Sequence, residues 1–129
     1  MAERAAAILD RGPWDVLVPV PLHPRREWQR GLNQAAFLAR RLGRRFGLPV
    51  APRALRRVRH TPPQAGDPED RRRNVRGAFV VGRPAQIAGR HVLLIDDVLT
   101  TGATANECAR TLRRAGARRV GVFTFARVP

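Results

Sequence analysis

The hydrophobic positions along the chain form short apolar runs and amphipathic stretches, which predict strands and helices in turn. Residues 15–20 (D-V-L-V-P-V) are apolar and are followed by further prolines, which is typical of a buried strand that ends there. Residues 32–46 carry apolar side chains at helical spacing and arginines on the opposite side. Gly47 and Pro49 end this pattern. We therefore expect a strand followed by an amphipathic helix.

The clearest strand–helix–strand unit lies in the last third of the chain. We expect a strand over 90–95, a turn over 96–102, a helix over 103–115 that is closed by Gly116, and a strand over 119–125. Short connections between such elements imply a right-handed parallel crossover. The sequence therefore predicts an α/β fold in which helices flank a mostly parallel sheet.

The segment between these units is less regular. Residues 53–59 are compatible with a short edge strand, and residues 78–81 with a strand that returns beside it. Residues 60–76 are polar, charged and contain prolines, so we interpret them as a long mobile loop. A loop of this length in a small domain is usually functional or disordered.

Length and cysteine content limit the classes of protein that the chain can represent. Its 129 residues suffice for a single domain, 1–129, and no apolar run approaches the roughly 20 residues that span a bilayer. Residues 1–10 lack the long apolar core of a signal peptide. The lone cysteine, Cys108, excludes an internal disulfide and a cysteine zinc cluster; it lies on the apolar helix face, so we interpret it as a core residue. A cytoplasmic location is the simplest interpretation.

The formal net charge is +15, and all 25 basic residues are arginine. Arginine in place of lysine on ordinary solvated faces explains the choice of residue but not the size of the excess. A polyanionic partner, either nucleic acid or a phosphate-rich substrate, explains the excess. The absence of lysine also excludes a Walker A lysine, a Schiff-base lysine and a lysine general base.

One segment carries candidate chemistry: residues 92–104 read V-L-L-I-D-D-V-L-T-T-G-A-T. An apolar strand leads to two carboxylates, Asp96 and Asp97, and then to a loop of small and hydroxyl residues that enters a helix. Ligands of open α/β sheets bind beyond the carboxyl ends of the strands, and a helix N-terminus suits a phosphate. Carboxylates do not attract a bare phosphate, but they accept hydrogen bonds from sugar hydroxyls or support a magnesium ion. The pattern indicates a sugar-phosphate site; the alternative is a strand end and helix start without a ligand.

This segment resembles the signature of type I phosphoribosyltransferases, which binds phosphoribosyl pyrophosphate (PRPP). Further stretches are similar to the ComF family of competence proteins, and the resemblance runs from about Asp15 to Val128. These stretches are V-P-V-P-L-H-P-R-R (18–26), R-G-L-N-Q-A (30–35), T-P-P-Q (61–64) and R-R-R-N-V-R-G-A-F (71–79).

The resemblance implies a type I phosphoribosyltransferase-like fold with a small flexible flap over about 60–76. It also implies transfer of the phosphoribosyl group to an unidentified nitrogenous base with release of pyrophosphate, with Mg²⁺ as cofactor. Asp96 and Asp97 are the expected catalytic residues, which would hold the ribose hydroxyls and could support magnesium. The residues expected to bind the 5-phosphate are Thr100, Thr101, Gly102, Ala103 and Thr104. Those expected to bind pyrophosphate are Pro21, Leu22, His23, Arg25 and Arg26. The expected flap residues are Arg71, Arg72 and Arg73. The turn residue His23 could equally be bonded to backbone, and the arginines could equally belong to a solvated loop.

Two departures from the family leave a second function open. Family members usually begin with a four-cysteine zinc ribbon, which this chain lacks, so a truncated or short form is one interpretation. Thr100 and Ala103 stand where purine-salvage relatives carry an aspartate general base and a lysine. The alternative to an enzyme is therefore a non-catalytic PRPP-binding or DNA-associated module in competence. Weak nucleic-acid binding, competence partners and an oligomer are compatible with either function.

Overall fold

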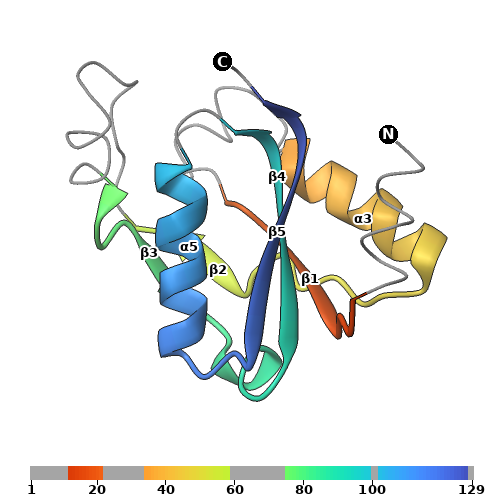
Figure 1. The fold of residues 1–129 in the computed structure, drawn as a ribbon. Helices are drawn as coiled ribbons and strands as arrows, with labels where there is room; N and C mark the ends of the chain where they lie inside the picture. The colour runs from red at the N-terminus through yellow and green to blue at the C-terminus, as the bar shows by residue number, and fades with distance from the viewer. Residues whose placement is uncertain (1–11, 22–33, 59–74, 100–101, 128–129) are drawn as a thin grey trace.

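The computed structural model describes residues 12–21, 34–58, 75–99 and 102–127, and Figure 1 shows how they are arranged. The elements, in chain order, are β1 (Val16–Pro19), α3 (Gln34–Phe46), β2 (Leu55–Arg57), β3 (Phe79–Val81), the 3-10 helix η1 (Pro84–Gln86), β4 (His91–Leu99), α5 (Ala103–Arg114) and β5 (Arg119–Arg127).

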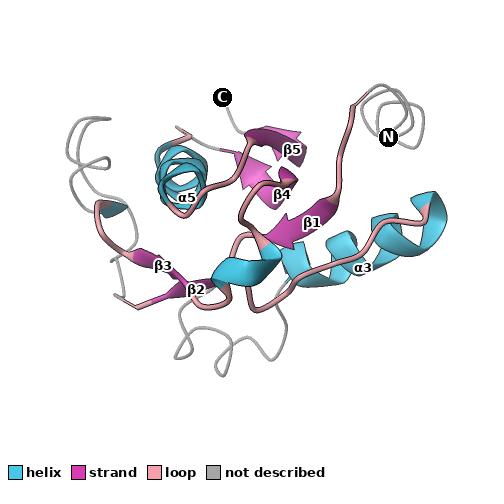
Figure 2. Cartoon of the chain, turned by 90° about the horizontal axis from the view of Figure 1, so that it is seen from below, coloured by secondary structure: helices cyan, strands magenta, loops and turns pink. Residues whose placement is uncertain are grey.

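A parallel sheet forms the centre of the molecule, with the strand order β1-β4-β5. Val16 to Pro19 of β1 pair with Val92 to Ile95 of β4. On its other side, β4 pairs with β5 from His91 to Leu99. Figure 2 shows α3 and α5 on opposite sides of this sheet. The expected α/β fold, with helices flanking a parallel sheet, is confirmed.

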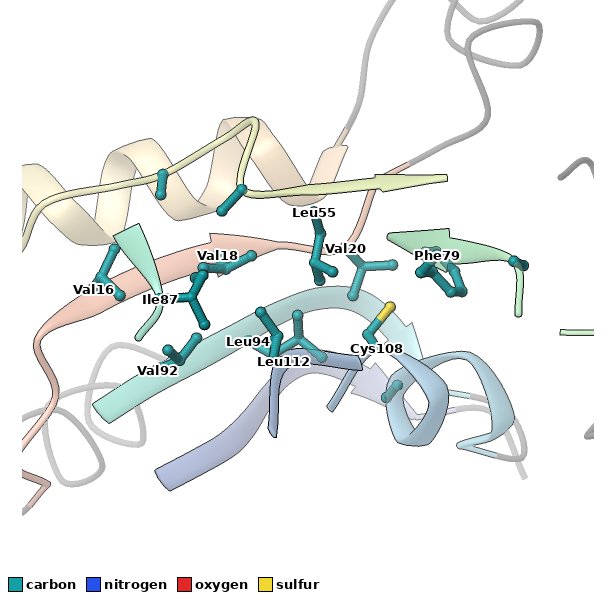
Figure 3. Close-up of a cluster of buried hydrophobic side chains, with 14 residues drawn as sticks. Val16, Val18, Val20, Leu55, Phe79, Ile87, Val92, Leu94, Cys108 and Leu112 are labelled. Carbon is teal, nitrogen blue, oxygen red and sulfur yellow. The ribbon is translucent and has the colours of Figure 1, made fainter. Parts of the chain in front are cut away.

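The pleat of the strands explains how both faces of the sheet are buried. Successive strand residues point to opposite faces, so Val92 and Leu94 contact the layer that contains α5. Leu93 and Ile95 belong instead to the cluster that contains α3. Figure 3 shows the α5 side, where side chains of the sheet meet Cys108 and Leu112 of α5 and Leu55 and Phe79 of the β2–β3 pair. A strand buried on both faces requires a continuous apolar run, and V-L-L-I in β4 supplies it.

The segment after α3 returns alongside β1. Leu17 donates its backbone N–H to the Pro49 carbonyl at 2.9 Å, and Ala51 donates to the Leu17 carbonyl at 2.9 Å. Gly43 permits this close return, because a Cβ there would lie 2.7 Å from the Leu48 carbonyl oxygen. The segment that follows α3 therefore lies beside β1, at the edge of β1 that does not pair with β4.

Two boundaries differ from the sequence prediction. The predicted turn over 96–102 is wrong in its first part, because β4 continues through Asp96 and Asp97 to Leu99. The reason is that β5 extends to Arg127 and offers a pairing partner along this whole length. The predicted mobile loop is wrong at its end, where Val75 is 2% exposed and therefore belongs to the buried interior. The rest of that loop, residues 60–74, lies outside the described residues.

Candidate functional site

The candidate site lies where β1 and β4 meet at their carboxyl ends. From β1 the chain passes through α3 to the segment at Val50, on one side of β1. From β4 it passes through α5 to β5, on the other side. The strand order thus reverses direction between β1 and β4. In open α/β sheets such a reversal creates a crevice outside the carboxyl ends, and ligands bind there.

Asp96 and Asp97 lie at this end of the sheet, where the two neighbours of β4 pair with it over different lengths. Pairing with β1 stops at Pro19 and Ile95, whereas pairing with β5 continues past Asp96, which is in register with Thr124. On the β1 side of β4, the last backbone contact among the described residues is the Val20 N–H, which donates to the Ile95 carbonyl at 2.8 Å. Beyond Ile95, no described strand pairs with β4 on this side. The sequence prediction that both carboxylates follow the end of a central strand therefore holds for the pairing of β4 with β1, which stops at Ile95, but not for its pairing with β5, which continues to Leu99.

The two carboxylates have different surroundings. Alternation along β4 puts Asp96 on the face of α5 and Asp97 on the face of α3. Asp96 is 8% exposed, and Asp97 is half-buried. Asp97 is thus the more accessible of the pair to a ligand, and Asp96 lies closer to the interior.

The loop after β4 enters α5 through Gly102, whose φ is +82°. This left-handed conformation favours glycine, since a Cβ would be strained there. Asn106 donates its N–H to the Gly102 carbonyl at 2.8 Å, which is the first bond of the helix. Gly102 has no side chain to cap the helix, and the first-turn amides of an α-helix have no intrahelical acceptor. Their donors and the positive end of the helix dipole suit a phosphate.

The structure describes only part of the predicted ligand-binding set. Gly102, Ala103 and Thr104 lie at the start of α5, and Pro21 is buried just beyond β1, at the same edge of the sheet as Asp96. The other predicted 5-phosphate, pyrophosphate and flap residues lie outside the described residues: Thr100, Thr101, Leu22, His23, Arg25, Arg26, Arg71, Arg72 and Arg73.

Charged side chains that the sequence analysis did not single out lie beneath this crevice. Arg57 and Glu107, like Asp96, are each 8% exposed. The guanidinium of Arg57 lies 4.9 Å from the Phe79 ring centroid. A signal for Arg57 was present, because the period of two along β2 places it on the same inward face as Leu55.

Glu107 connects α5 to the chain that leads into β3. Its Oε2 accepts the Gly77 N–H at 3.1 Å, and its Oε1 accepts Nε of Arg110 at 3.1 Å. The helical spacing does not predict that Glu107 links α5 to the segment before β3, because residue 107 lies at the margin of the apolar face of the helix.

Cys108 lies between these charges. Burial raises the pKa of its thiol, the Arg57 charge opposes that increase, and Asp96 and Glu107 add to it. The thiol is fully buried, so the interpretation of Cys108 as a core residue rather than a nucleophile is confirmed.

The donors at the crevice fit a magnesium ion bound together with a phosphorylated ligand. Mg²⁺ usually keeps several waters and takes one or two carboxylates plus substrate phosphates, rather than a complete protein cage. Asp96 and Asp97 provide such carboxylates. Among the described residues, no group of three or more acidic, histidine or cysteine side chains could hold a metal ion.

Comparison with known sequences identifies similar proteins. The family model described as "Phosphoribosyl transferase domain" matches residues 5–129. Competence protein F of Haemophilus influenzae is 39% identical over 115 residues, covering 88% of this chain and 50% of that protein. DNA utilization protein YhgH of Escherichia coli K12 is 40% identical over 114 residues, covering 88% and 49%. Competence protein ComFC of Bacillus subtilis is 34% identical over 113 residues, covering 87% and 44%. The chain thus spans about half the length of the curated relatives it matches.

Comparison with solved structures gives the same fold. A purine phosphoribosyltransferase from Pyrococcus horikoshii superimposes with a TM-score of 0.59 at 20% identity, covering 99% of this chain and 73% of that one. The glutamine PRPP amidotransferase of B. subtilis, solved with ADP and GMP, gives a TM-score of 0.61 at 20% identity, covering 93% and 24%. At this identity the likeness shows the fold alone. Among the described residues, no helix is long and apolar enough to cross a membrane.

Proposed function

The chain belongs to the phosphoribosyl transferase domain family, among the ComF competence proteins, and from that premise we propose that it binds PRPP and transfers its phosphoribosyl group to a nitrogenous base. The observation that carries the proposal is the position of Asp96 and Asp97. They lie at the reversal of strand order and lead directly into the N-terminus of α5. A site with acceptors at one end and anion-binding amides at the other suits a ribose with a 5-phosphate.

Different residues of this chain have different roles at such a site. Asp96 and Asp97 accept hydrogen bonds from the ribose hydroxyls and hold the sugar with its reacting carbon exposed to the base. The loop before α5 holds the 5-phosphate. Magnesium, when bound, would be held by Asp96 or Asp97 together with PRPP and would supply positive charge for the departing pyrophosphate. Buried carboxylates also stabilise the positive charge that develops on the ribose as pyrophosphate leaves.

The proposed reaction is slow, because Thr100 is not a carboxylate and the chain contains no lysine. General base catalysis typically contributes about 100- to 10,000-fold, while positioning and charge stabilisation remain without it. The test is to titrate PRPP in the presence of magnesium and then screen nucleobases for pyrophosphate release. We expect slow release, with a pyrimidine or an unusual base at least as good an acceptor as hypoxanthine. Hypoxanthine or guanine turnover at the rate of a dedicated salvage enzyme would contradict this proposal.

The same Thr100 observation favours a second candidate function, in which the chain binds PRPP without transferring it and acts as a module of a competence or DNA-utilization protein. Proteins so named are among its relatives. The screen distinguishes the two functions. Tight PRPP binding without pyrophosphate release, for any base, would favour the binding module.

A further inference from the structure

The outward face of α3 is cationic and lies away from the crevice. Its exposed side chains are Phe37, Arg40, Arg41, Arg44 and Arg45, and we call this set the α3 arginine face. Positions 37, 41 and 44 repeat at helical spacing, with 40 and 45 on either side of this line, so they form a continuous stripe. The opposite side of the helix, with Ala39 and Leu42, is buried against the sheet. The stripe is therefore available to a partner while the helix stays packed.

Neutralising carboxylates are absent from this stripe. The helix itself, residues 34–46, contains no acidic residue. In the part of the chain that the structure describes, acidic residues occur only at Asp15, Asp96, Asp97 and Glu107. Asp96 and Glu107 are buried, Asp15 bonds to His91 at the beginning of β4, and Asp97, although on the α3 side of the sheet, lies within β4 and not on the surface of the helix. Four arginines within two helical turns thus concentrate positive charge that the described chain does not balance locally.

An exposed aromatic ring lies within the same stripe. Phe37 is 44% exposed, which makes it one of few large apolar side chains on the described surface. The guanidinium of Arg41 lies 5.9 Å from its ring centroid. A ring held beside guanidinium groups offers a base both a stacking surface and a nearby phosphate contact.

We propose that the α3 arginine face binds single-stranded nucleic acid. The arginines contact successive phosphates, and Phe37 stacks on a base that a single strand exposes and a duplex keeps paired. Stacking of this kind tolerates any base, so the site reads the backbone rather than the sequence.

A second group of exposed arginines provides a comparison. Arg90, Arg113, Arg114 and Arg118 lie where β4 and β5 begin and α5 ends, and the Arg118 N–H donates to the Arg90 carbonyl at 2.9 Å. The Asp15 carboxylate lies at this end as well. The aromatic ring there, Trp14, is half-buried and packs over Gly121, where an added Cβ would lie 2.3 Å from the ring. This end has charge without an exposed stacking ring, so it serves as a matched control.

The proposal is independent of PRPP binding and catalysis. The α3 arginine face is on the opposite side of the sheet from α5 and contains none of the proposed PRPP-binding residues. A variant without nucleic-acid affinity should therefore keep its PRPP affinity.

Fluorescence anisotropy with a labelled oligo-dT 20-mer, at several salt concentrations between 50 and 200 mM, tests the proposal. The variant R40Q/R41Q/R44Q/R45Q should bind at least about tenfold more weakly at 50 mM salt, and its slope of log Kd against log salt should be smaller by about three. The variant R90Q/R113Q/R114Q/R118Q loses the same charge and should bind like the wild type. Replacement of the four α3 arginines by lysine should keep both affinity and slope, which excludes misfolding as the cause.

A Phe37→Ala variant tests the stacking. It should weaken oligo-dT binding about tenfold while changing the affinity for a duplex of equal length less than about twofold. Equal losses in the α3 variant and in the control variant would overturn the proposal, because binding would then follow total charge. So would the absence of binding at 50 mM salt, an unchanged oligo-dT affinity for Phe37→Ala, or sedimentation showing that the α3 arginine face joins two copies of the chain without affecting nucleic acid.

Discussion

At the residue scale, Asp15 links the starts of two strands that are far apart in the sequence. Its Oδ2 accepts the His91 N–H at 2.7 Å and lies 3.2 Å from Nδ1 of the same residue. The hydrogen bond from the His91 backbone, with that from its ring, lowers the pKa of Asp15. A lowered folded-state pKa stabilises the fold above the unfolded pKa of about 3.9, and this contribution is lost as pH falls through the folded value.

Asp15→Asn should therefore lower the melting temperature at pH 6 to 7, where the carboxylate is charged. Below about pH 4 the difference from the wild type should shrink, because the wild-type carboxyl becomes protonated as well. Thermal unfolding followed by circular dichroism between pH 3 and 7 measures this. A difference in melting temperature that stays constant over the whole pH range would show that Asp15 does not act through its charge.

Thr100 is the residue at which the family resemblance and the proposed chemistry diverge. Thr100→Asp supplies a carboxylate and should increase hypoxanthine turnover at saturating PRPP by up to about 100-fold, although its negative charge also weakens PRPP binding at the phosphate loop. Thr101→Asp is the matched control: it adds the same charge to the phosphate loop, so it should weaken PRPP binding without faster turnover. Steady-state pyrophosphate release measures both variants. No rate increase in Thr100→Asp would indicate that proton removal does not limit the reaction.

At the scale of elements, Glu107 joins α5 to the segment before β3. Glu107→Ala removes the carboxylate that accepts the Gly77 N–H, which should cost about 1 kcal/mol of unfolding free energy, the usual net contribution of one hydrogen bond. Glu107→Gln keeps a carbonyl acceptor and should lose less. Urea unfolding compares the two variants. If alanine and glutamine destabilise the protein equally, the Gly77 hydrogen bond is not the source of the effect.

The elements also show what sequence patterns can and cannot predict. The apolar run V-L-L-I and the helical spacing after Gly102 were sufficient to predict the first part of β4, the helix α5 and the two carboxylates that follow the apolar run. The length of β4 was not predictable from its own residues, because Asp96 and Asp97 have low strand propensity and are held in the strand by pairing with β5. Glu107 was missed for a related reason, because its burial depends on a contact with a distant segment, at Gly77. The burial of Arg57 was instead indicated by the period of two along β2.

At the scale of the whole molecule, the sheet separates two surfaces. The proposed PRPP site lies between the ends of β1 and β4 and continues toward α5. The α3 arginine face lies on the other side of the sheet. The four arginines of the α3 arginine face contribute to the net charge of +15 and lie apart from the proposed PRPP site.

The sequence predicts that residues 60–76 close over the crevice as a flap, and residues 60–74 of this segment lie outside the described part of the chain. We expect PRPP with magnesium to protect this segment from limited proteolysis. Peptide mapping of the cleavage sites by mass spectrometry, with and without ligand, measures the protection. Cleavage within 60–74 at the same rate in both conditions would contradict the flap hypothesis.

The central claim is that the strand-order reversal carrying Asp96 and Asp97 is a PRPP site. Calorimetric titration of PRPP with magnesium into the wild type and into Asp96→Asn/Asp97→Asn tests it most directly, with Asp15→Asn as a control that removes one carboxylate elsewhere. We predict that the double variant loses PRPP binding while remaining folded by circular dichroism, and that Asp15→Asn binds like the wild type. An unchanged PRPP affinity in the folded double variant would contradict the claim.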